Sequence, residues 1–342
     1  MSRWRTLTTL GIAGLAIGGT LAGCGTNATA SGKVVTIGYE NAPDPEAVAI
    51  EQHFFQKYLH AKVKLIYFSS GPAALTDLAS GHLDFMTTLG NPPTASAIAH
   101  GVPLEVVWAM ERYTTGEGLV VKNSSGITSL KGLKGKTVAL VKGSTSPFEL
   151  DTALKNAGMP LSSVTQENMT PPDMVAAWQH GSIQAAYVWT PFDNTMQQNH
   201  GHFIMYDQNV YKQSPIFNLA VVNSHWASSH KSLVDGFVKA EAAGVKFFHQ
   251  HPTKSYQDMG KLNNISAAQA KSQTKGFQYE TLATEVQSMG MGQGAAVKTS
   301  LVTKSLSSAA KWLSQTGQIS SAPHNLAQYV NPSFVESVMK GH

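Results

Sequence analysis

Short apolar runs alternate with segments of helical periodicity along most of the chain. Residues 33–39 predict a first strand, residues 45–58 a helix, and residues 62–68 a second strand. Residues 70–81 then carry a small polar cap, a proline in the first turn and a glycine past the end, which is how a short helix begins and ends. The same order recurs further on, and it predicts an α/β fold with mostly parallel sheets.

The strand and helix pattern falls into two blocks joined by extended segments near residues 117–122 and 217–223. Two crossings of the chain between the blocks predict a hinge. We assign residues 33–117 and 220–342 to lobe 1 and residues 118–219 to lobe 2. A chain of 342 residues is too long for one small core and fits two domains of ordinary size.

The first 23 residues have the pattern of a signal peptide. Arg3 and Arg5 precede an uncharged stretch over residues 7–21 that is too short and too weakly apolar for a stable transmembrane helix. Leu21 to Cys24 (LAGC) resembles the lipobox of bacterial lipoproteins, so we expect lipidation of Cys24, with residues 24–32 as a flexible tether. A buried structural Cys24 is the alternative. The expected location is the cell membrane, facing the periplasm or the cell exterior.

Composition narrows the classes of function. The chain has 25 Lys and Arg against 21 Asp and Glu, and removal of the signal peptide with Arg3 and Arg5 would leave 23 against 21. This small excess of positive charge argues against binding to nucleic acid. A single Cys leaves no disulfide, Cys-based zinc site or Cys nucleophile in the body. The tightest histidine pairs, in residues 199–202 and 249–251, have no carboxylate nearby in sequence. We therefore expect no metal and no cofactor.

Polar or aromatic residues follow four predicted strands, each ahead of a proline that opens a helix. They are Ser70 with Gly71, Asn91, the run Ser144, Thr145 and Ser146, and Trp189. Helix N-termini at the carboxyl ends of strands present free N–H groups, so the four exits predict an anion site. Each exit alone is equally explained by local helix capping, and Ser146 with Glu149 has the capping-box pattern.

Several stretches resemble the taurine- and aliphatic-sulfonate-binding proteins of ABC transporters. They include residues 68–73 (FSSGPA), 176–181 (AAWQHG) and 186–191 (AYVWTP), and the similarity extends from about residue 33 to the C-terminus. The resemblance implies a type II periplasmic-binding-protein fold, in which a monomeric two-lobed clamp closes on its ligand without catalysis. It also implies delivery of a small sulfonate to an ABC permease in the membrane.

The resemblance also implies roles for the residues at the strand exits. Ser70, Gly71, Asn91, Ser144, Thr145 and Ser146 should face the sulfonate, Trp189 should wall the carbon chain, and Glu117 should bind the amine of taurine. The second amine-binding carboxylate of the family is Asn218 here, which adds no charge and weakens the case for taurine over an alkanesulfonate. Trp178 lies between alanines within a helix and is assigned to the core.

Three other functions remain open. The chain could bind another small anion or a nitrogenous solute, or it could present its ligand to a membrane receptor as a lipoprotein sensor. An enzyme of the related thiamine-pyrimidine-synthesis branch is disfavoured, because that branch uses a Cys-rich iron site and this chain has one Cys.

Overall fold

The structure, a computed structural model, describes residues 33–210 and 215–341. The expected signal peptide, the tether and Cys24 lie outside the described residues. From Val34 onward the chain forms one compact unit. None of the helices in the described part is long and apolar enough to cross a lipid bilayer.

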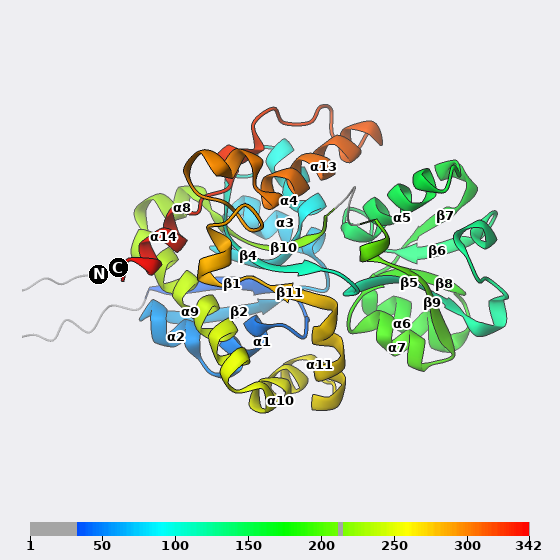
Figure 1. Cartoon of the computed structure of the whole chain (residues 1–342), viewed down its shortest axis with the longest axis horizontal. Coiled ribbons are helices and arrows are strands. Elements are labelled where there is room, and N and C mark those ends of the chain that lie inside the picture. Colours follow the sequence, from blue (N-terminus) through cyan, green and yellow to red (C-terminus); the bar gives the residue numbers. More distant parts are fainter. Residues whose placement is uncertain (1–32, 211–214, 342) are drawn as a thin grey trace, which may run out of the picture. The chain divides into compact units, whose positions relative to one another are not determined.

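The first sheet has six strands in the order β11-β4-β10-β3-β1-β2 (Figure 1). Strand β1 pairs in parallel with β2 and β3, whereas β10 runs antiparallel to both β3 and β4. The strands are β1 (Val34–Tyr39), β2 (Lys62–Tyr67), β3 (Phe85–Gly90), β4 (Leu104–Tyr113), β10 (Phe217–Asn223) and β11 (Phe277–Tyr279).

The second sheet has five strands in the order β7-β6-β8-β5-β9. Strand β6 pairs in parallel with β7 and β8, and β5 runs antiparallel to β8 and β9. The strands are β5 (Glu117–Lys122), β6 (Thr137–Leu140), β7 (Thr165–Asn168), β8 (Ala185–Trp189) and β9 (Gly201–Tyr206).

The predicted α/β class is confirmed, but the sheets are mixed rather than mostly parallel. The reason is that the strands next to the two crossings, β5 and β10, each run against their neighbours. The strand bounds place Glu117 in the second sheet and Phe217 to Leu219 in the first, a shift of a few residues from the predicted lobe boundaries.

Helices cover both faces of each sheet. In the first sheet α3 and α4 lie on β3, α13 packs on α4, and α9 packs against α1 and α2; in the second, α5, α6 and α7 lie against β8, β6 and β5 respectively. The helices are α1 (Pro45–Glu51), α2 (Phe54–Leu59), α3 (Gly71–Ser80), α4 (Asn91–Ala99), α5 (Thr145–Asn156), α6 (Pro171–His180), α7 (Phe192–Gln198), α8 (Ser224–Ser229), α9 (Lys231–Gln250), α10 (Pro252–Asn263), α11 (Ala267–Gln273), α12 (Leu282–Glu285), α13 (Leu301–Gln315) and α14 (Ser333–Met339).

The single helix predicted over residues 45–58 is two helices. His53 adopts a left-handed backbone conformation with φ of 57°, which interrupts the helical hydrogen bonding between α1 and α2. The short connection lets both helices pack against α9.

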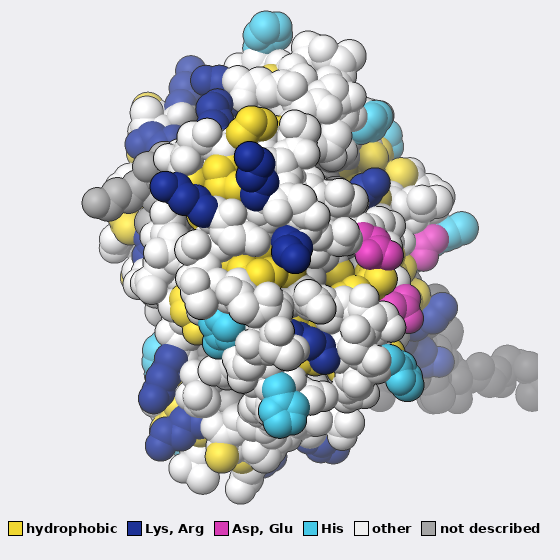
Figure 2. Space-filling view, turned by 90° about the vertical axis from the view of Figure 1, so that its right-hand side faces the viewer, with side chains coloured by type: hydrophobic (Ala, Val, Ile, Leu, Met, Phe, Trp, Pro, Cys, Tyr) yellow, Lys and Arg dark blue, Asp and Glu magenta, His cyan; other side chains and the backbone are white. Residues whose placement is uncertain are grey.

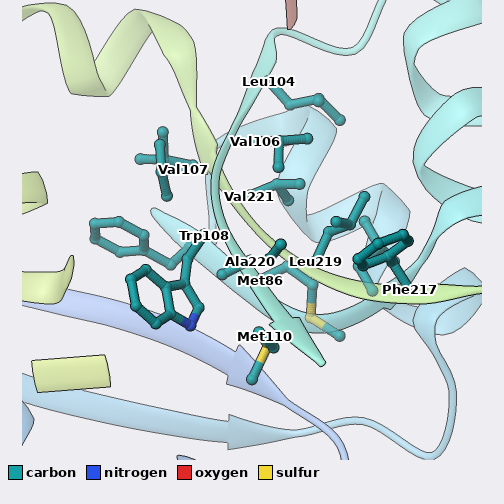
Figure 3. Packing of buried hydrophobic residues seen from close by; sticks show 14 of the residues in the cluster. Met86, Leu104, Val106, Val107, Trp108, Met110, Phe217, Leu219, Ala220 and Val221 are labelled. Atoms are coloured by element: carbon teal, nitrogen blue, oxygen red, sulfur yellow. The ribbon is translucent and has the colours of Figure 1, made fainter. Parts of the chain in front are cut away.

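The main core lies around β3, β4 and β10, whose apolar side chains interdigitate in Figure 3. Met86, Trp108 and Phe217 are among its fully buried members. Each such side chain contributes about 1.5–3 kcal/mol through removal of apolar surface from water. In the second sheet, Leu119 and Val120 of β5 belong to separate clusters, because successive side chains of a strand point to opposite faces. These cores fix the strand ends from which the site is built.

Candidate ligand pocket

A cavity lies where helices begin after strands of both sheets. Helix α3 follows β2, α4 follows β3 and α5 follows β6, so three helix N-termini come to the same region. The cavity is lined by Glu40, Asn41, Ala42, Gly71, Pro72, Thr88, Gly90, Pro93, Tyr113, Ser144, Thr145, Trp189, Thr190, Asn218 and Phe277. The empty space at this site measures about 420 Å³, including the part that is open to solvent.

Five of the residues predicted from the sequence line this cavity, and four do not. Gly71, Ser144, Thr145, Trp189 and Asn218 form part of the wall. Ser70, Asn91, Glu117 and Ser146 are buried behind it. Contact of any of the nine with a ligand stays a prediction.

Glu117 is buried behind the start of α5 and is held by the hydroxyls there. Thr145 Oγ1 donates to Glu117 Oε2 at 2.5 Å, and the hydroxyl of Ser146 donates to Glu117 Oε1. The backbone N–H of Glu117 donates to Asp207 Oδ2 at 2.8 Å. Ser146 thus directs its hydroxyl at a carboxylate and not into the cavity, while Thr145 connects the carboxylate to the cavity wall.

The capping box predicted for Ser146 and Glu149 is wrong. Helix α5 begins two residues earlier, with Ser144 as the N-cap whose Oγ accepts from Ser146 N at 3.3 Å. Glu149 instead accepts a hydrogen bond from the Tyr187 hydroxyl. The reason is the glycine at residue 143, whose positive φ of 81° turns the chain into the helix just before Ser144.

Asn91 ties the first sheet to distant segments. Its amide nitrogen donates to the carbonyl oxygens of Pro215 at 3.3 Å and Ser305 at 3.2 Å. Ser70 is the N-cap of α3, although its side chain makes no capping hydrogen bond. Both residues therefore support the wall from behind.

The side chain of Asn218 is hydrogen-bonded to the carboxyl of Glu111. Its Nδ2 donates to Glu111 Oε1 and to Tyr113 Oη, both at 2.7 Å. The amide of Asn218 at the cavity wall thus has a carboxyl directly behind it.

Glu40 is the principal residue that the sequence reasoning missed. It directly follows β1, is 8% exposed, and lines the cavity beside Gly71. Its backbone N–H donates to Thr88 Oγ1 at 3.0 Å, and Thr88 has a φ of 52°, an uncommon backbone conformation for a β-branched residue. Its position directly after a strand, shared with the predicted site residues, is the signal for Glu40 in the sequence.

Burial raises the pKa of the carboxyls around the cavity. Desolvation, with the nearby Glu117, holds the pKa of Glu40 well above its usual range. Desolvation raises the pKa of Glu117 to about 7, against the opposing effect of the Ser146 and Thr145 hydrogen bonds. Desolvation and Asp44 likewise raise the pKa of Glu111. Among the described residues, no Lys or Arg lines the cavity.

Three carboxyls of the second sheet lie close enough to share a metal ion. Oxygen atoms of Glu117, Glu149 and Asp207 all lie within 4.8 Å of one another, and all three residues are buried. Burial raises the pKa of Glu149 and of Asp207, with their mutual repulsion adding to desolvation in Glu149. None of these three side chains lines the cavity.

The two tryptophans of the sequence motif occupy different environments. Trp189 lines the cavity and is 8% exposed. Trp178 is fully buried in α6, and its Nε1 donates to the carbonyl of Asn199 at 2.8 Å. The prediction that Trp178 belongs to the core is confirmed.

In comparisons with known proteins, the chain is similar to binding proteins named for taurine and aliphatic sulfonates. The model of the NMT1-like family matches residues 30–259. The chain is 28% identical over 308 residues to the taurine-binding periplasmic protein of Escherichia coli, covering 88% of this chain and 92% of that protein. It is 30% identical over 240 residues to a putative aliphatic sulfonates-binding protein of Bacillus subtilis, covering 68% of this chain and 71% of that protein.

A solved structure shares the fold. The alkanesulfonate-binding protein SsuA from Xanthomonas axonopodis pv. citri, bound to MOPS, superposes with a TM-score of 0.71 at 18% identity, over 87% of this chain and 98% of that one. At this identity the likeness concerns the fold, which is that of periplasmic binding proteins.

Proposed function

The chain belongs to the NMT1-like family, and from this membership and the pocket we propose that it is an exported binding protein that captures a small sulfonate for an ABC importer. The observation that carries the proposal is the convergence of three helix N-termini on one cavity, in a chain whose relatives are named for taurine and aliphatic sulfonates. Binding alone is proposed, with no reaction.

A sulfonate fits the chemistry of the wall. It stays ionised at any ordinary pH, so it needs hydrogen-bond donors and not a proton acceptor. The free backbone N–H groups at the starts of α3 and α5 are such donors, and the positive ends of the helix dipoles favour the charge. Ser144 and Thr145 add hydroxyls, while Trp189 and Phe277 offer apolar surface to a short carbon chain.

Uptake requires release as well as capture. The two sheets both contribute to the cavity, so opening of the predicted hinge would expose the ligand to a membrane permease. Lipidation of Cys24, with residues 24–32 as tether, would keep the monomer near that permease. These parts of the proposal follow from the sequence and from the kind of protein to which the chain is similar.

A ligand panel tests the proposed function. We expect taurine or ethanesulfonate to raise the melting temperature of the purified protein, and sulfate, acetate and an uncharged alcohol of similar size to leave it unchanged. The buffers must contain no sulfonate, which excludes the common morpholine and piperazine sulfonates. Stabilisation by sulfate or by a nitrogenous solute alone would replace the sulfonate by another ligand class.

A further inference from the structure

Most of the acidic side chains are inside the protein. Of the 21 Asp and Glu in the chain, fourteen are buried, whereas no Lys, Arg or His is buried in the described part of the chain. The buried acids are Glu40, Asp44, Glu46, Asp84, Glu111, Glu117, Glu149, Asp151, Asp193, Asp207, Glu241, Asp258, Glu280 and Glu285.

The outer surface shows the reverse pattern. On the face in Figure 2, Lys, Arg and His side chains are spread widely, and the few Asp and Glu lie near one edge. Acidic residues are almost never fully buried in proteins unless a cation pairs with them. Asp258 has such a partner in Lys254, but among the described residues no Lys or Arg lines the ligand cavity, and fourteen buried acids are a strong departure from the usual distribution.

Burial without a cation favours the uncharged acid. An ionised carboxylate loses its hydration inside the protein, and a neutral carboxyl loses far less. Several buried carboxyls also have an oxygen without any hydrogen-bond partner among the described residues, including Asp44 Oδ2, Glu111 Oε2 and Asp193 Oδ2. A proton on such an oxygen removes the uncompensated charge.

Glu40 is the buried acid that lines the ligand cavity with its carboxyl unengaged. Within the described residues no group hydrogen-bonds this carboxyl, unlike those of Glu117 and Glu111, which accept from Thr145 and Asn218. The carboxyl also lies at the start of α3, where a Cβ added to Gly71 would come within 3.2 Å of Glu40 Oε1. The carboxyl of Glu40 therefore lies at the N-terminus of α3, where a bound anion would accept hydrogen bonds from the helix.

The titratable groups that face Glu40 would not hold it ionised. They are Glu117 from β5, Glu111 and Tyr113 from β4, and Tyr67 at the end of β2. None is a cation. An ionised Glu40 would repel a sulfonate at this helix N-terminus, whereas a protonated Glu40 has an O–H to donate.

We propose that protonated Glu40 is a ligand-binding residue, which donates its O–H to a sulfonate oxygen, so that the protein takes up its ligand together with a proton. The proposal rests on the proposed function, because it assigns a residue to the same pocket. No bond other than hydrogen bonds forms or breaks: the proton stays on Glu40 while the ligand is bound, and it is exchanged with water in the empty site.

Proton-linked binding has a measurable consequence. Above the pKa of Glu40 in the free protein, the affinity for a sulfonate without an amine should fall on the order of tenfold per pH unit. Ethanesulfonate is the suitable probe, because the amine of taurine would add its own interaction with a carboxylate.

The experiment is calorimetric titration of the purified protein with ethanesulfonate at about pH 5, pH 7 and pH 9, in buffers without sulfonate, because burial raises the pKa of Glu40 well above its usual range. The wild type should bind more weakly as pH rises through this range, and at intermediate pH titrations in two buffers of different ionisation enthalpy should show uptake of up to about one proton per ligand. Glu40→Gln, whose amide donates at every pH, should bind with little pH dependence and bind more tightly than the wild type at about pH 9. Glu167→Gln, at an exposed acid of β7, should behave as the wild type.

Three results would overturn the proposal. Affinity that is constant or rises with pH in the wild type shows that Glu40 does not bind as an acid. Equal loss of binding with pH in the wild type and in Glu40→Gln assigns the effect to another group or to unfolding. Absence of binding at every pH in all variants overturns the proposed function itself, and the inference with it.

Discussion

The methyl group of Thr145 packs against Gly90, so closely that a Cβ atom on residue 90 would lie 2.7 Å from Thr145 Cγ2. Gly90 ends β3 of the first sheet and Thr145 begins α5 beside the second, and both line the cavity. Real side chains do not approach so closely, so a residue larger than glycine at position 90 must move the two segments apart.

Gly90→Ala should therefore weaken sulfonate binding, by on the order of tenfold, because about 1.4 kcal/mol of strain would oppose this packing. Thr145→Ser removes the methyl group and keeps the hydroxyl that Glu117 accepts. The double variant Gly90→Ala with Thr145→Ser should recover most of the affinity in calorimetric titration. Wild-type affinity in Gly90→Ala, or no recovery in the double variant, would show that this contact does not control binding.

The two tryptophans should respond differently to truncation. Trp189→Ala removes part of the cavity wall and should reduce sulfonate affinity at least tenfold by loss of apolar contact, on the order of 1.5–3 kcal/mol. Trp178→Ala empties a core position and should cost about 3–5 kcal/mol of unfolding free energy. Denaturant unfolding and calorimetry on both variants separate the effects. If Trp178→Ala lost affinity and Trp189→Ala kept it, the ligand would bind outside this cavity.

Asn218→Asp tests the contact between residue 218 and the buried carboxyl of Glu111. The sequence alone predicts that this change raises preference for taurine over ethanesulfonate. In the structure, however, the new carboxyl would face Glu111 in place of the amide N–H that Glu111 Oε1 now accepts. We expect loss of stability, about 1–3 kcal/mol at neutral pH and less in acid, because the two acids must share a proton.

The matched double variant exchanges the two groups. Glu111→Gln with Asn218→Asp restores an amide–carboxyl hydrogen bond with the carboxyl now on the cavity side. It should recover the melting temperature and should bind taurine in preference to ethanesulfonate. A double variant as unstable as Asn218→Asp would contradict the assigned contact.

Stability should fall as pH rises. Burial raises the pKa of Asp193 to about 8 and those of Asp44 and Glu117 to about 7, above their unfolded values near 4. The folded protein thus binds more protons than the unfolded chain from about pH 4 up to about pH 7 for Asp44 and Glu117 and about pH 8 for Asp193, and each group contributes a loss of about 1.4 kcal/mol of stability per pH unit within its own range. The stabilisation is complete below the unfolded pKa.

Asp193→Asn isolates one of these groups. Asp193 is fully buried and its Oδ1 accepts from Thr190 and Asn194, whereas Oδ2 has no partner among the described residues. The amide mimics the protonated acid, so the variant should melt higher than the wild type at about pH 8 and alike at about pH 4. Melting curves across this range provide the check. Stability of the wild type that rises toward neutral pH would refute the inference of protonated interior acids.

The strand exits could be predicted from sequence because local rules determine them. Gly71 and Thr145 lie at helix starts marked by proline, glycine or hydroxyl residues, and the structure has both in the cavity wall. Which neighbour faces inward depends on rotation about the helix axis. Ser146 and Asn91 point away for this reason, and no local pattern distinguishes them from Ser144.

The burial of the acids could not be predicted. The chain has 21 Asp and Glu in 342 residues, and their positions in the sequence carry no pattern that distinguishes the buried from the exposed ones. Burial of Glu111 or Glu241 depends on contacts with segments far away in the chain, such as Asn218 against Glu111. Glu40 follows a strand directly, as the predicted site residues do, but the sequence does not show that its carboxyl is buried, which depends on the packed cavity.

The most direct test of the account is a crystal structure of the protein grown in acid with 2-bromoethanesulfonate, in which anomalous scattering from bromine marks the tail of the ligand. We predict density in the cavity, with the sulfonate at the starts of α3 and α5 beside Glu40, and the bromine toward Trp189. A ligand bound outside this cavity, or an empty cavity in crystals of a protein that binds the compound in solution, would contradict the central claim.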